Sequence, residues 1–326
     1  MNFLFLRGQV PQDRDPSEIV FNTIEECDDM WTHLAFEMSK QFNHSELWYW
    51  GGTRKKVFSN TFIERWIPSF QTYRSEFIPD VIMCRGGFDE YHDILKRFPN
   101  AIKIYYGAGK RFLPQNGFLD YHIILQDSPE QLQISKDKFP KSINTLFIKP
   151  AVENIFFHSS IMLEKQFDVC FPASGKRLDK GISFVFSSIP TDLKLLNLGY
   201  RNDKIRYPFN VIQKRVIRSK LFNEYQKCKV GIICSNSKSD SCPRVLPEML
   251  ASNIPVIILN TTHCWRERYI VSGITGELAT ESNFWSTVNR VLENRHQYKP
   301  RAYYNENLSL KIASDFLLKV INEISV

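Results

Sequence analysis

Short apolar runs alternate along this chain with segments of helical periodicity. Runs such as the one at residues 2–6 are bounded by polar residues and are typical of strands buried on both faces of a sheet. Between such runs, apolar residues recur at helical spacing; Met30, Leu34 and Met38, for example, are four residues apart. This alternation predicts an α/β fold with parallel sheets and crossover helices.

The pattern places the elements as follows. We predict strands at residues 2–6, 46–50, 79–84, 101–106, 120–125, 144–147, 166–171, 193–198, 229–234 and 255–259. We predict helices at residues 22–40, 62–73, 88–98, 220–226, 281–295 and 309–324, and one more that begins at Ser128.

A length of 326 residues favours two domains over one. The first set of strands closes at residue 147 and the second begins near residue 164, with a proline-bearing connection between them. We therefore predict a first domain at 1–155 and a second at 156–305, followed by a terminal segment at 306–326.

The composition is that of an ordinary globular protein, with 43% hydrophobic and 24% charged residues. No apolar run approaches the ~18 residues that a membrane-spanning helix needs, and we expect no integral membrane contact. The N-terminus is interpreted as a first strand and not as a signal peptide. Seven cysteines without a C-x-x-C pair indicate neither a zinc site nor a disulfide framework, and favour a cytoplasmic protein.

The net charge of +7 is concentrated in one segment. Residues 201–220 contain seven Lys or Arg residues and a single Asp. Two interpretations are open: a solvated face, or a surface that contacts a polyanion or a diphosphate.

Two carboxylates eight residues apart, Asp240 and Glu248, carry the clearest chemical pattern. A predicted strand at 229–234 leads into this segment and another at 255–259 leaves it, so both acids are expected at the carboxyl edge of a parallel sheet, where α/β folds bind ligands. Pro247 places Glu248 near the first turn of a helix. The alternative is an exposed acid pair on an ordinary turn.

This segment resembles the acid-x7-acid motif of the retaining glycosyltransferases that have two Rossmann-like domains, the GT-B architecture. The resemblance implies that Asp240 contacts a hydroxyl of the donor sugar and that Glu248 holds the ribose of the nucleotide. Backbone amides of Ser241, Cys242 and Arg244 would face the donor diphosphate. The chain departs from the pattern in having Asp as the first acid and Cys242-Pro243 where the family has Phe-Gly.

A basic loop at residues 175–181, GKRLDKG, resembles the Gly-Arg-Leu…Lys-Gly element of the same family. The resemblance implies that Lys180 and a second cation hold the donor diphosphate; the second cation is Lys176 or Arg177. The alternative is a solvated basic turn.

The connection at residues 148–158 looks like the hinge between the two domains of that family. The resemblance implies two Rossmann-like domains that face each other across a cleft, with the donor on the second domain. It also implies that the helix at 306–326 crosses back to the first domain. The donor would be a nucleotide-sugar, with a UDP-sugar favoured, and no bound metal is expected.

On the acceptor side, candidates come from strand ends and from one basic and aromatic cluster. Strand-end positions are Arg7, Gly8, Arg85 and Gly86, and His122 is either structural or catalytic. The cluster at 48–56 contains Trp50, Arg54, Lys55 and Lys56, a mixture used by nucleic-acid binders and by carbohydrate binders.

The sequence therefore predicts a retaining nucleotide-sugar-dependent glycosyltransferase whose acceptor is open. In architecture and composition the chain resembles phage enzymes that glycosylate 5-hydroxymethylcytosine in DNA, which would make double-stranded DNA a partner and the host cytoplasm the location. The alternatives are a glycan or lipid-linked acceptor, a sugar-nucleotide epimerase, or a non-catalytic nucleic-acid-binding protein. The oligomeric state is open.

Overall fold

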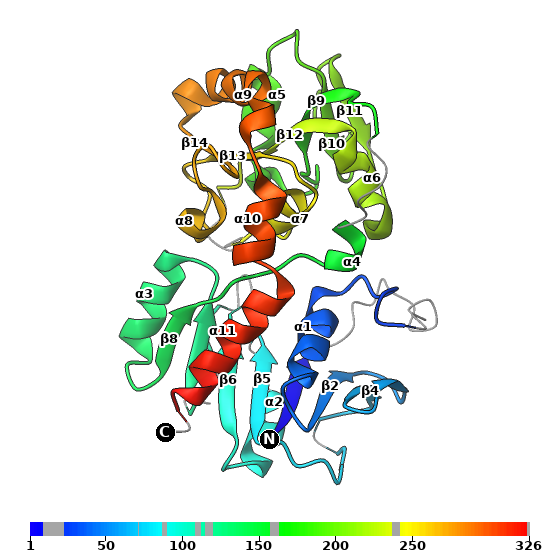
Figure 1. Ribbon diagram of the computed structural model, residues 1–326, viewed down its shortest axis with the longest axis vertical. Coiled ribbons are helices and arrows are strands. Elements are labelled where there is room, and N and C mark those ends of the chain that lie inside the picture. Colours follow the sequence, from blue (N-terminus) through cyan, green and yellow to red (C-terminus); the bar gives the residue numbers. More distant parts are fainter. Residues whose placement is uncertain are drawn as a thin grey trace. The chain divides into compact units, whose positions relative to one another are not determined.

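A computed structural model describes residues 1–8, 23–70, 72–86, 90–107, 112–114, 120–156, 163–236 and 242–324. The chain forms two compact units (Figure 1). One comprises Met1–Ile148 with Leu310–Val326, and the other comprises Lys149–Ser309. Each unit has its own largely parallel sheet, which confirms the predicted class of two Rossmann-like domains.

The sheet of the first unit has the strand order β3-β4-β2-β1-β5-β6-β7-β8. All neighbouring strands are parallel except β3 and β4. The strands are β1 (Asn2–Arg7), β2 (His44–Trp50), β3 (Lys55–Ser59), β4 (Phe62–Ile67), β5 (Val81–Arg85), β6 (Ile102–Tyr106), β7 (Ile123–Gln126) and β8 (Ile143–Leu146). The helices are α1 (Met30–Ser39), α2 (Tyr91–Arg97), α3 (Pro129–Lys138) and α11 (Leu310–Asn322).

Helix α1 begins later than the sequence predicted. Asp29 is its N-cap and accepts a hydrogen bond from the Thr32 amide at 3.0 Å, so residues 23–29 are turn and bend and not helix. The predicted apolar stripe is correct, because Met30, Leu34 and Met38 are all buried. Helix α11 packs on α1, and the Ser314 hydroxyl lies 3.1 Å from the sulfur of Met38.

The segment at 51–78 contains the main error of the sequence prediction. The predicted helix at 62–73 is wrong, since Phe62–Ile67 is strand β4, which forms a hairpin with β3. Phe62 and Trp66 are four residues apart and look helical, yet both are buried from a strand. The reason is tertiary: β4 pairs with β2 along its whole length, and pairing overrides a weak local preference.

The sheet of the second unit has the order β11-β10-β9-β12-β13-β14, and all its neighbouring strands are parallel. The strands are β9 (Phe167–Phe171), β10 (Leu195–Leu198), β11 (Val211–Lys214), β12 (Cys228–Ile233), β13 (Val256–Leu259) and β14 (Gly276–Ala279). The helices are α4 (Glu153–Phe156), α5 (Ile182–Ser188), α6 (Leu221–Gln226), α7 (Val245–Ala251), α8 (Arg266–Tyr269), α9 (Phe284–Glu293) and α10 (Pro300–Asn307).

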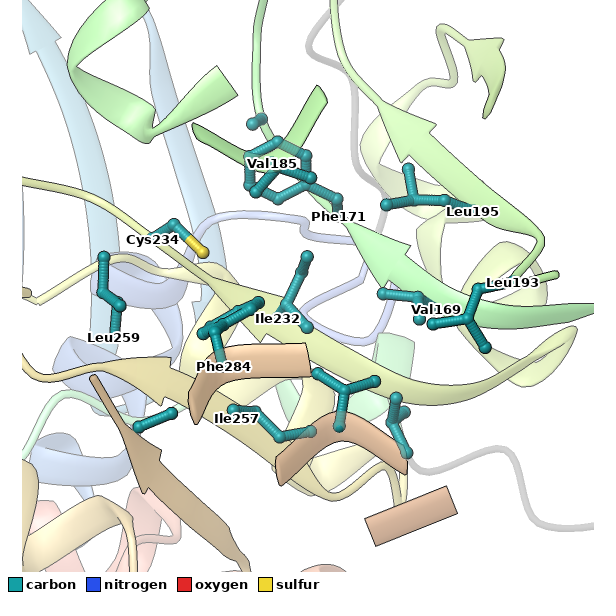
Figure 2. Packing of buried hydrophobic residues seen from close by; sticks show 14 of the residues in the cluster. Val169, Phe171, Val185, Leu193, Leu195, Ile232, Cys234, Ile257, Leu259 and Phe284 are labelled. Atoms are coloured by element: carbon teal, nitrogen blue, oxygen red, sulfur yellow. The ribbon is translucent and has the colours of Figure 1, made fainter. Parts of the chain in front are cut away.

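A hydrophobic core holds this second sheet to its helices (Figure 2). Side chains from neighbouring strands, such as Val169, Ile232 and Ile257, lie against Phe284 of α9 and Val185 of α5. All five are fully or almost fully buried. This core fixes the strand ends from which the loops of the candidate site emerge.

We predict that Phe284→Ala lowers the free energy of unfolding by about 3–5 kcal/mol, because it leaves a large cavity in this core. Asn289→Ala, on the exposed face of the same helix, is the matched control and should stay within about 0.5 kcal/mol of the parent protein. Urea unfolding followed by circular dichroism measures both values. Equal losses for the two variants would contradict the assigned core.

Candidate functional site

The basic loop at 175–181 is held against the carboxyl end of β12 by a glycine. Gly181 has φ +78°, and a Cβ at this position would lie 2.3 Å from the carbonyl oxygen of Cys234. Only glycine fits such a contact in the left-handed conformation. The Asn236 amide donates to the Asp179 carbonyl at 3.0 Å, so the loops that follow β9 and β12 are joined directly.

A second glycine joins the same basic loop to the end of β10. The Gly175 amide donates to the Tyr200 carbonyl at 2.8 Å, and the side-chain amide of Asn202 donates to the Gly175 carbonyl at 2.9 Å. The loops after β9, β10 and β12 therefore meet at one edge of the sheet, as expected for ligand sites in parallel α/β folds.

The two cations that the sequence could not separate have different surroundings. Arg177 forms two hydrogen bonds with the Asp179 carboxylate, at 2.8 and 2.6 Å, which balance its charge. Lys176 is exposed, and its Nζ lies 4.3 Å from the centre of the Tyr200 ring.

Lys180 lies in an excess of positive charge. The pKa of its ammonium is lowered to about 8, mainly by burial and then by the charge of Arg177, against the opposing effect of Asp179. Lys149 and Arg244 also lower this pKa, so four cations are near one another here. Such a group favours binding of an anion with more than one negative charge.

Lys149 is a member of this group that the sequence analysis missed. It is only 8% exposed, and its Nζ donates to the carbonyl of Cys242 at 3.0 Å. Its backbone amide donates to the Tyr269 hydroxyl at 2.7 Å, which fixes its position at the start of the second unit. The available signal was a lysine directly after the apolar run Leu-Phe-Ile at 146–148.

Glu248 is buried in the first turns of α7. Pro247 lies in the first turn of this helix, as the sequence predicted, and Glu248 is 2% exposed. The carboxylate accepts from Arg218 Nη2 at 2.5 Å and from the Tyr225 hydroxyl at 3.4 Å. The alternative of an exposed acid pair is therefore wrong for Glu248.

Two of the predicted site residues, Asp240 and Ser241, lie outside the described residues. Of the other residues predicted to face the diphosphate, Cys242 is buried and Arg244 is exposed at the N-cap of α7. Arg218 was recognised only as part of the basic segment, because its partner lies thirty positions later in the chain.

The first unit gathers most of the acceptor-side candidates at one edge of its sheet. The parallel strands β1, β2 and β5 end there, and β3 begins there because it runs antiparallel to β4. The candidates at this edge are Arg7, Gly8, Trp50, Arg54, Lys55, Lys56, Arg85 and Gly86. His122 is different: it precedes β7 at the opposite edge, and its Nδ1 accepts from the Lys103 amide at 3.0 Å.

The predicted basic and aromatic cluster is only partly a surface. Trp48 and Tyr49 are 2% and 7% exposed, and Tyr49 packs on Trp66. These rings form core contacts and offer no face to a base or a sugar. Trp50 is half-buried, whereas Lys55 is exposed.

Arg7 is part of a partly buried polar network at this edge. It forms an ion pair with Asp29 and donates to the Tyr49 hydroxyl at 3.1 Å. Glu64 was not predicted as a site residue, yet burial, and then the nearby charge of Asp29, raise its pKa to about 7. Glu64 lies inside β4, opposite Lys56 of β3, and a carboxyl group with this pKa is a candidate general acid or base.

The described residues contain no group of three His, Cys, Asp or Glu side chains able to hold a metal ion. None of the helices in the described part of the chain is long and apolar enough to cross a bilayer.

Comparison with solved structures shows the fold again. The chain is similar to sucrose-phosphate synthase from Thermosynechococcus elongatus (TM-score 0.71, 10% identity, 99% of this chain and 98% of that one). It is also similar to Anabaena HepE, solved with UDP and glucose (TM-score 0.66, 10% identity, 99% and 100%). A third neighbour is the lipopolysaccharide outer core galactosyltransferase WaaB (TM-score 0.64, 12% identity, 99% of both chains). No protein-family profile and no curated protein sequence matches the chain.

The pKa of Lys180 predicts a pH dependence of anion binding. Because this pKa is about 8 in the folded protein, the ammonium is charged below that pH and loses its charge above it. We expect the dissociation constant for UDP to rise by up to about tenfold per pH unit above pH ~8, measured by calorimetry. Lys180→Arg, which stays charged, should flatten this rise, and Lys180→Met should bind weakly at every pH. A rise that persists in Lys180→Met would assign the effect to another group.

Proposed function

We propose that this protein is a glycosyltransferase that moves a sugar from a nucleotide-sugar donor, a UDP-sugar by preference, to an acceptor hydroxyl. The observation that carries the proposal is the presence of two features in the second unit, which helix α7 connects because Arg244 is its N-cap and Glu248 lies within it. One is the group of cations around Lys180, and the other is the buried carboxylate of Glu248. A nucleoside diphosphate has the matching chemistry, with charged phosphates next to a ribose diol.

The cations serve the leaving group in this proposal. Negative charge grows on the diphosphate as the bond to the sugar breaks, and cations placed in advance stabilise that charge. Lys149 is held by its hydrogen bond to Cys242, and Arg177 by its two hydrogen bonds to Asp179, while Lys176 and Arg244 are exposed. Cys242 belongs to the same site, because its backbone carbonyl accepts a hydrogen bond from Lys149 Nζ.

Glu248 would bind the ribose hydroxyls. Arg218 keeps its carboxylate in place and balances its charge, and each carboxylate oxygen has a further lone pair to accept from a hydroxyl. Asp240 would contact the donor sugar. Transfer would retain the anomeric configuration, with the donor phosphate assisting deprotonation of the acceptor, so the two acids are not a glycosidase pair.

The first test measures UDP release from a panel of UDP-sugars, with GDP- and ADP-sugars beside them. We expect Lys180→Met and Glu248→Gln each to reduce turnover by about 10²-fold or more. Lys136→Met, on the exposed face of α3, should leave turnover unchanged. No release from any donor, with the variants folded as the parent protein, would contradict the proposal and favour the non-catalytic alternative.

The acceptor is identified in the same assay. One candidate is 5-hydroxymethylcytosine in duplex DNA, whose phosphates would contact exposed cations of the first unit. The other is a glycan or lipid-linked hydroxyl. Burial of Trp48 and Tyr49 removes two of the stacking surfaces on which the DNA hypothesis rested. Release stimulated only by the modified DNA supports the first candidate, and stimulation by glycans or lipids supports the second. Release or isomerisation without any acceptor indicates an epimerase.

Arg218 provides a sharper test of the ribose contact. Arg218→Ala removes the group that orients Glu248, and we expect the dissociation constant for UDP to rise about 10- to 100-fold. The same substitution should have a much smaller effect on 2′,3′-dideoxy-UDP, which lacks both ribose hydroxyls. Arg218→Lys should recover part of the loss. Equal effects on the two nucleotides would contradict the ribose role of Glu248.

A further inference from the structure

Exposed apolar side chains gather in one stretch of the second unit. Among the described residues, Phe209 is the most exposed large hydrophobic residue, at 83%, and Ile217 and Ile212 are 64% and 51% exposed. All three lie in the basic segment at 201–220, which neither the fold nor the donor site explains apart from Arg218. Single exposed apolar residues are ordinary, but three of them between residues 209 and 217 of a strongly basic segment are not.

The turn that presents Phe209 is firmly held. The side-chain amide of Asn210 donates to the carbonyls of Pro190 and Leu193, at 2.8 and 2.7 Å, and the Val211 amide donates to the Pro208 carbonyl at 3.1 Å. The backbone on both sides of Phe209 is thus fixed while its ring faces solvent.

The exposure of Ile212 follows from its position in strand β11. It lies in β11, the edge strand of the second sheet, where Val211 points into the core. Because side chains alternate along a strand, Ile212 and Lys214 share the outward face. Arg206 lies three residues before Phe209, and Arg215 two residues before Ile217, so each exposed apolar side chain has a cation near it along the chain.

The charge of this segment is mostly not neutralised within the unit. Asp203 pairs with Arg201 at 3.2 Å, and Lys214 pairs with Glu224 at 2.6 Å. In the part of the chain that the structure describes, Lys204, Arg206 and Arg215 form no ion pair. We call the set Lys204, Arg206, Phe209, Ile212, Arg215 and Ile217 the β11 patch.

Two tyrosine rings near the β11 patch lie beside cations of the protein itself. Lys176 Nζ and Arg215 Cζ lie 4.3 and 4.1 Å from the centre of the Tyr200 ring. Arg201 Cζ lies 5.0 Å from the Tyr207 ring, which also packs on Phe186. Phe209 is the one aromatic member of the β11 patch, and Ile212 and Ile217 are aliphatic, so the patch offers no row of ring faces on which successive bases could stack. Aliphatic and phenyl groups among cations instead match a lipid surface, which offers phosphates above an apolar layer.

We propose that the β11 patch docks the protein on an anionic membrane surface. Phe209, Ile212 and Ile217 enter the headgroup layer, and the three cations pair with lipid phosphates. The docking does not depend on the proposed transferase activity, since it needs neither donor nor acceptor.

The test is flotation of the full chain with vesicles of phosphatidylcholine, with and without phosphatidylglycerol. We expect binding only to the vesicles with phosphatidylglycerol, and its loss as salt is raised. Lys204→Gln with Arg206→Gln should weaken binding by roughly 25-fold, about fivefold for each cation. Phe209→Ser with Ile217→Ser should weaken it by about tenfold or more.

Matched controls come from α3 in the first unit. Lys136→Gln with Lys138→Gln removes the same charge, and Ile134→Ser removes an exposed apolar residue; both should leave vesicle binding within about twofold. Melting temperature and circular dichroism check that every variant is folded. Absence of binding to the anionic vesicles overturns the proposal, as does equal weakening by the controls. Binding to duplex DNA instead, weakened by the charge variant but not by Phe209→Ser with Ile217→Ser, would assign the surface to nucleic acid.

Discussion

Parallel pairing of strands is the constraint on which both units depend. Parallel neighbours require a crossover between them, so the helices must return over the sheet, and all carboxyl ends then meet at one edge. In the second unit this brings β9 beside β12, with Val169 opposite Val230, although the two strands are far apart in the chain. Their loops must then pack closely, and Gly181 is the residue whose missing Cβ allows the contact with Cys234.

The loops at that edge concentrate charge in a way that folding alone does not favour. Lys180 is partly buried near Lys149, Arg177 and Arg244. Its pKa is lowered because burial and these positive charges destabilise its charged form. Glu248, in helix α7, is also buried, but its charge is balanced by an ion pair with Arg218. Like charges held close together are expected at functional sites. A bound nucleoside diphosphate would neutralise the cations around Lys180 with its phosphates and would contact Glu248 with its ribose.

Much of this fold could be predicted from sequence, because long apolar runs and helical stripes carry strong local information. The strands at both ends of the acid motif, the helix N-cap at Ser128 and the place of Pro247 in α7 were all correct. The errors occurred where local signals were weak or equivocal. The aromatic spacing in Phe62–Ile67 fits a helix, and only the pairing of β4 with β2 makes it a strand. The sequence indicated a binding surface that includes Trp48 and Tyr49. Both side chains are instead buried, because they lie in a sheet that is covered on both faces.

The order of the residues established the class of fold, the two sets of strands and the loops that carry the cations and the acids. These features follow from periodicity and from short spacings, which the chain specifies locally. Tertiary structure alone placed Lys149 beside Cys242, Arg218 on Glu248, and the start of β3 at the same edge as Arg7. The same holds for Phe209, whose exposure depends on the bonds of Asn210 to a distant turn. Each of these contacts joins positions well separated in the chain, and such contacts arise from the register and order of strands, which no local pattern encodes.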